Sequence, residues 1–114
     1  MIVDPSALEA YREVMEDEAD EFIADILGSF YSNARELFSA MDEALTKDNA
    51  EGFVRAAHTF KSTAATVGAI PLSGLLANLE KRGGSEPLAG LEPLIPPLKQ
   101  AYEEVESKLR ELYP

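Results

Sequence analysis

The sequence contains no cysteine and a single histidine, His58. The absence of cysteine excludes disulfides, thiolate metal sites and a cysteine nucleophile. Zinc and iron sites usually recruit several histidine or cysteine ligands, so a lone imidazole argues against such a site. We therefore expect this chain to bind no metal and no other cofactor.

Long apolar runs and excess positive charge are also missing. No uninterrupted apolar stretch approaches the ~20 residues that a membrane span requires, and no amino-terminal segment has the pattern of a signal peptide. The chain carries 10 basic and 21 acidic side chains, a net charge of −11. Because binding phosphates of nucleic acids requires clustered Lys and Arg, this charge argues against a nucleic-acid partner. We expect a cytoplasmic protein that binds neither membranes nor nucleic acids.

The residues that are present predict one all-α domain covering residues 1–114. A chain of 114 residues with 46% hydrophobic content fits a single core. Glycine and proline are sparse before residue 68, and apolar residues recur at spacings of three and four, which is the helical period.

Capping and turn residues divide this pattern into five helices. Asp4 and Pro5 form a good helix start, and glycine at position 68 suits the left-handed conformation that ends helices. The predicted helices run from about 5 to 16, from about 18 to 46, from a cap at Asp48 or Asn49 to near Val67 and Gly68, from Pro71 to Gly83 and Gly84, and from Pro97 almost to the carboxyl end.

The prolines at 93, 96 and 97 leave residues 85–97 open between a loop with one helical turn and a kinked helix start. The four longer helices, joined by short connections, predict an antiparallel four-helix bundle, with the additional short N-terminal helix as a cap at one end. Stripes of Leu, Phe, Tyr and Met are the ordinary filling of such a bundle core.

His58 falls on the outer face of the third predicted helix. At about 100° per residue, the apolar residues of this helix lie within about 40° of Phe53 and form its core face. They are Ala57, Phe60, Ala64 and Val67. His58 lies about 140° from Phe53, Ala65 about 120° and Ser62 about 180°. The imidazole is therefore predicted to point outward or to the flank, beside small residues that allow close docking of another molecule.

The charges near His58 differ in sign from those of the whole chain. Residues 55–84 carry a net charge of +3, while the remaining residues carry −14. Arg55 and Lys61 lie three residues either side of His58, within side-chain reach of the same patch. A surface histidine among scattered charges is also an ordinary feature of helical bundles, and the spacing alone does not decide between a site and plain surface.

These residues resemble the phosphoacceptor motif of histidine-containing phosphotransfer (HPt) domains. In that family a helix carries H-x-L-K-G, small residues and then G-A or G-L ten residues after the histidine, followed by a leucine-rich helix. His58, Lys61, Gly68 and Ala69 stand at matching positions, and LSGLLANLEKRG is similar to the following helix. The likeness covers about residues 20–112. It departs from the motif at Phe60, which replaces Leu, and at Ser62, which replaces Gly and could hydrogen-bond or crowd a phosphoryl group.

The resemblance implies roles for individual residues. His58 would accept a phosphoryl group on Nε2, and Lys61 would neutralise phosphoryl oxygens. Glu80 is a candidate to accept a hydrogen bond from the other ring nitrogen, or else a plain surface acid paired with a neighbouring cation. The expected partner-binding residues are Arg55, Ser62, Ala65, Gly68 and Ala69.

The resemblance also implies the partners, which are the receiver domain of a response regulator, a sensor histidine kinase, or both. The receiver would supply the accepting aspartate and Mg²⁺, because this chain shows no phosphate-cradling glycine loop and no nucleotide motif. The chain would then be a phosphoryl carrier and not an enzyme. We expect a monomer, although the sequence leaves the oligomeric state open.

Two other functions stay open at this level. The first is a helical interaction module that keeps the docking face and uses no phosphate. The second is an enzyme with His58 as general base, which is poorly supported because no Ser or Cys nucleophile with an orienting partner is readable from spacing. A core filled with Leu and Phe also leaves little room for a substrate.

Overall fold

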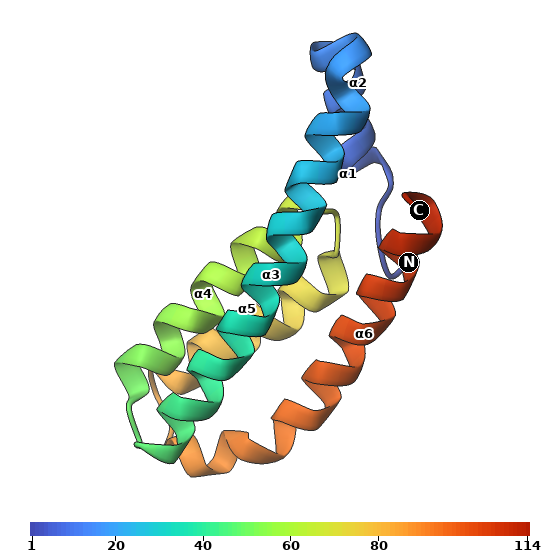
Figure 1. The fold of residues 1–114 in the computed structure, drawn as a ribbon. Coiled ribbons are helices and arrows are strands. Elements are labelled where there is room, and N and C mark those ends of the chain that lie inside the picture. The colour runs from blue at the N-terminus through green and yellow to red at the C-terminus, as the bar shows by residue number, and fades with distance from the viewer.

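Figure 1 shows the computed structural model, which describes all 114 residues. Four long helices run alternately up and down as an antiparallel bundle, and short N-terminal helices lie at one end. The predicted all-α fold is confirmed. The elements are α1 (Ser6–Glu9), α2 (Tyr11–Met15), the 3₁₀ helix η1 (Glu16–Glu18), α3 (Ala19–Thr46), α4 (Ala50–Thr66), α5 (Ile70–Gly83), the 3₁₀ helix η2 (Leu88–Leu94) and α6 (Ile95–Leu112).

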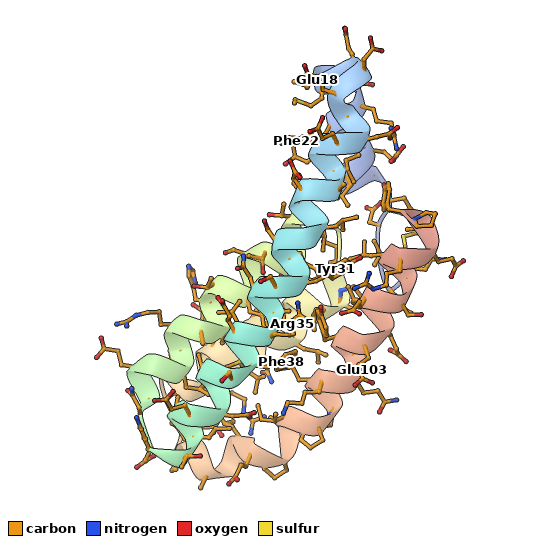
Figure 2. All side chains as sticks on the ribbon, in the orientation of Figure 1. Glu18, Phe22, Tyr31, Arg35, Phe38 and Glu103 are labelled. Atoms are coloured by element: carbon orange, nitrogen blue, oxygen red, sulfur yellow. The ribbon has the colours of Figure 1, made fainter.

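The core is apolar and closely interlocked. Phe38 of α3 and Phe60 of α4 meet edge to face, with ring centroids 5.0 Å apart, and Phe38 lies 5.6 Å from Tyr102 of α6. Figure 2 shows Phe38 and Tyr31 extending from α3 toward α6. The one buried side chain with a polar group is that of Tyr102, whose hydroxyl donates to Oε1 of Glu106 at 2.8 Å.

The two ends of α4 are fixed by specific residues. Asn49 is its N-cap, and the Asn49 side chain accepts a hydrogen bond of 3.0 Å from the Gly52 backbone N–H. Gly68 has a φ of +82°, the left-handed conformation that glycine adopts without strain. The backbone N–H of Asp4 donates to the Gly68 carbonyl oxygen at 2.8 Å. The N-terminal segment is thereby tied to the turn between α4 and α5.

The prediction of one helix over residues 5–16 is wrong in detail. The chain forms α1 and α2 and then turns at Glu16, whose φ of +50° interrupts the helix. The start of the first helix is as expected, because the Asp4 carboxylate accepts a hydrogen bond of 3.0 Å from the Ser6 backbone N–H.

Residues 85–97 form a short loop, a 3₁₀ helix and the first residues of α6. The 3₁₀ helix η2 accommodates Pro93, and α6 begins at Ile95, so that Pro96 and Pro97 occupy its first turn. Proline is tolerated there because its missing N–H has no intrahelical partner to lose. None of the helices combines the length and hydropathy needed to cross a membrane.

Candidate functional site

His58 lies in the middle of α4 with its side chain 60% exposed. The core stripe of the same helix is buried as predicted, and it consists of Phe53, Ala57, Phe60, Ala64 and Val67. The prediction that the imidazole points away from the core is therefore confirmed.

The ring is held by a carboxylate from the neighbouring helix. Nδ1 of His58 lies 2.9 Å from Oε2 of Glu80 on α5. An ionised carboxylate only accepts hydrogen bonds, so Nδ1 carries the proton in this contact. Nε2 of the neutral ring then keeps its lone pair. The ring nitrogen that Glu80 does not contact, Nε2, belongs to a side chain that is 60% exposed.

The same carboxylate also holds Lys61. Oε1 of Glu80 lies 2.7 Å from Nζ of Lys61, and the Glu80 side chain is only 24% exposed. The hydrogen bond from Lys61, and next the one from His58, hold the pKa of Glu80 below its usual value. Glu80 therefore stays ionised throughout the physiological range, and it brings a cation and an imidazole together.

Two contacts set the position of α5 beside α4. The Ser73 hydroxyl donates to the Lys61 carbonyl oxygen at 3.1 Å. A Cβ at Gly83 would lie 2.8 Å from the Phe53 ring, so only glycine lets the two helices approach this closely. The resulting register places Glu80 against His58. Nothing in the sequence pattern pointed to Ser73 as part of this arrangement.

The surface beside the imidazole is small and polar, as expected. Ser62 and Ala65 are exposed. The Ser62 hydroxyl lies 3.3 Å from the His58 carbonyl oxygen, to which it donates. A partner can approach the ring without displacing a bulky side chain.

The predicted basic patch is partly neutralised. Arg55 is exposed and pairs with Glu51 at 2.9 Å, and Arg82 pairs with Glu86 at 2.9 Å. Lys61 is engaged by Glu80, so Lys81 is the one cation of residues 55–84 that forms no ion pair.

The prediction that Gly68 and Ala69 contact a partner is wrong, because both residues are buried. Ala69 is 0% exposed and belongs to the core. A Cβ at Gly68 would collide with the carbonyl oxygen of Asp4. The N-terminal segment covers this turn, which the periodicity of α4 alone could not reveal.

No group of three or more His, Cys, Asp or Glu side chains is arranged to hold a metal ion. A groove of about 350 Å³ between α3 and α4 is lined by residues that include Ile26, Thr63 and Thr66, and His58 is not among them. The imidazole thus stands on an open face and not in a substrate pocket.

The Hpt domain family matches residues 25–108, which contain all of α4 and α5. The chain belongs to the Hpt domain family. It is similar in structure to histidine-containing phosphotransfer protein B (HptB) from Pseudomonas aeruginosa PAO1, with a TM-score of 0.81 and 24% sequence identity over 98% of this chain and 94% of that chain. At that identity the likeness supports the fold. No curated protein matches the chain. Membership in the family indicates a phosphotransfer role in a phosphorelay, with receiver domains or kinases as the class of partner.

Proposed function

We propose that this domain is a phosphorelay intermediate that accepts a phosphoryl group on Nε2 of His58 and passes it to or from the aspartate of a receiver domain. The observation that carries the proposal is the contact between His58 and Glu80. In the neutral ring this contact suits a proton on Nδ1, which leaves the lone pair on Nε2 of a side chain that is 60% exposed.

The transfer can be written with these atoms. Nε2 attacks the phosphorus of an aspartyl phosphate, the N–P bond forms, and the P–O bond breaks with its electron pair leaving on the aspartate carboxylate. The ring then holds a phosphoryl group on Nε2, a proton on Nδ1 and a positive charge, which the Glu80 carboxylate stabilises. In the reverse direction the electrons of the N–P bond return to Nε2, and the ring leaves as neutral imidazole.

Lys61 supplies the nearest positive charge. Its ammonium group lies 2.7 Å from the carboxylate that also contacts the ring, and a lysine stem is flexible enough to reach a phosphoryl group on Nε2. A phosphorylated residue carries about −1.5 to −2 charges, so a charge-assisted bond from Lys61 stabilises it.

The remaining chemistry comes from the partner. Phosphoryl transfer depends on positioning and on cations around the equatorial oxygens, usually including Mg²⁺. This chain binds no cofactor of its own in the proposal, and Mg²⁺ belongs to the receiver. The domain thus acts as a monomeric carrier and not as an enzyme, with Arg55, Ser62 and Ala65 on the docking face.

The test is phosphotransfer profiling of the purified domain against the phosphorylated receiver domains of its organism, and loading with phosphoramidate as a small phosphoryl donor. We expect acid-labile, alkali-stable phosphate on the wild type and none on His58→Gln. Receiver binding without any such phosphate would contradict the proposal, and would favour an interaction module that uses no phosphate.

A further inference from the structure

Ile70, the first residue of α5, exposes a large apolar side chain on the folded bundle. It is 57% exposed, so more than half of its surface is open to solvent. The other large apolar residues with comparable exposure are Met1, Ile2 and Val14 in the N-terminal segment and Leu75 on α5.

Helical geometry places Ile70 on the side of α5 that borders His58 of α4. Taking Glu80 as zero, Ser73 lies at about 20° and Ile70 at about 80°. Glu80 and Ser73 both contact α4, through His58 and the Lys61 carbonyl oxygen. The buried residues of α5 lie on the other side of Glu80, at about −40° to −100°, and they are Leu72, Leu76 and Leu79. Ile70 therefore faces outward beside α4.

Between the imidazole and Ile70 lies Lys61, whose side chain is drawn to Glu80, and the other residues on this surface are small. On α5 the same outward side carries Gly74 and Ala77, at about 120° and 60°, and both are exposed. Because Ser73 is bonded opposite Lys61, Ile70 lies opposite the turn of α4 that holds Ala65. That turn is about 10 Å along the helix axis from His58.

This distance indicates which kind of partner can cover Ile70. A standard protein interface buries about 800 Å² on each partner, a patch roughly 30 Å across. A protein that brings an aspartate to Nε2 of His58 and docks with such a footprint therefore also covers Ile70. We infer that Ile70 is an apolar anchor for the receiver domain that exchanges phosphoryl groups with His58. This inference rests on the proposed function and extends its docking face along α5.

Leu75 provides a matched control on the same helix. It is 45% exposed. On the scale that takes Glu80 as zero, it lies at about 220°, on the opposite side of α5. There it lines a depression of about 80 Å³ with Leu94 and Pro97. A partner centred on His58 does not reach it.

The experiment compares Ile70→Ser with Leu75→Ser. Each variant is loaded with phosphoramidate, and transfer is then followed to the receiver domain that exchanges fastest with the wild type. Losing half the burial of an isoleucine corresponds to about a ten-fold weaker encounter. We expect Ile70→Ser to raise KM for the receiver about ten-fold at unchanged kcat, and Leu75→Ser to leave both constants as in the wild type.

Other results would overturn the inference. If both variants match the wild type, or raise KM equally, Ile70 is not the anchor, although His58 transfer still stands. If Ile26→Ser in the groove between α3 and α4 raises KM and Ile70→Ser does not, the partner docks on the other flank of α4. If the loaded wild type transfers to no receiver, the proposed function falls and the inference falls with it.

Discussion

At the scale of single residues, Glu80 is the carboxylate that contacts the imidazole of His58. Glu80→Gln keeps an oxygen that can accept from Nδ1 but removes the charge that stabilises the phosphorylated ring. Charge-assisted hydrogen bonds are about twice as strong as neutral ones. We therefore expect Glu80→Gln to slow phosphorylation of His58 by phosphoramidate about ten-fold, and Glu80→Ala to slow it further. Phosphorus NMR of the loading reaction measures both rates.

Glu86→Gln is the matched control for that experiment. Glu86 pairs with Arg82 and does not contact His58, so the same loss of charge should leave the loading rate unchanged. Equal rates for Glu80→Gln and the wild type would show that the carboxylate has no electrostatic role.

The pH dependence of the contact follows from the lowered pKa of Glu80, for which Lys61 is the largest cause. A carboxyl with a lowered folded-state pKa contributes stability above its usual pKa, and this is lost as the pH falls through the lowered value. We expect Lys61→Met to raise the pKa of Glu80 more than His58→Gln does. A carbon-13 NMR titration of the Glu80 carboxyl in the three proteins measures the order, and a larger effect of His58→Gln would contradict it.

Only part of this residue-level arrangement was predictable. The outward direction of His58 follows from the period of one helix. The contact with Glu80 joins residues 22 positions apart and depends on the register between α4 and α5, which Ser73 and Gly83 set. No pattern within a single helix encodes that register, so Glu80 became a candidate through the resemblance to HPt domains.

At the scale of the elements, the turn between α4 and α5 depends on Gly68. Alanine there would be strained at a φ of +82°, and its Cβ would collide with the Asp4 carbonyl oxygen. We expect Gly68→Ala to lower the free energy of unfolding by at least about 2 kcal/mol. Gly28→Ala is the control, because its Cβ would meet open space inside α3, and it should stabilise the fold by about 0.5–1 kcal/mol. Urea unfolding measures both, and equal stability of the two variants would refute the argument.

Helix boundaries were predictable where a cap or a proline marks them, as at Asn49 and, to within two residues, at Pro97. The predictions failed where segments that are distant in the sequence contact each other. Gly68 and Ala69 were assigned to the docking face because their positions match a motif. The segment around Asp4 covers Gly68, a contact over more than 60 residues that helical periodicity does not contain, and Ala69 packs into the core.

At the scale of the whole molecule, the net charge of −11 opposes encounter with a partner whose docking surface is acidic, as the proposed function expects of the receiver. A local positive potential can offset this repulsion near His58. Ion pairs already neutralise Arg55, Lys61 and Arg82. Steering at this face therefore depends mainly on Lys81, which also lies on the outward side of α5 at about 100° from Glu80.

Lys81→Gln should accordingly slow association with the receiver about two- to three-fold at low salt, because it removes the unpaired cation of the docking face. The difference from the wild type should vanish near 1 M salt, where the Debye length falls to about 3 Å. Lys108→Gln is the control, since it changes the net charge equally on α6, where Lys108 pairs with Glu111. Stopped-flow association at several ionic strengths separates the two variants. Equal slowing by both variants would mean that the net charge, and not the position of Lys81, governs the association rate. If the association rate of the wild type does not change with salt concentration, electrostatic steering is excluded.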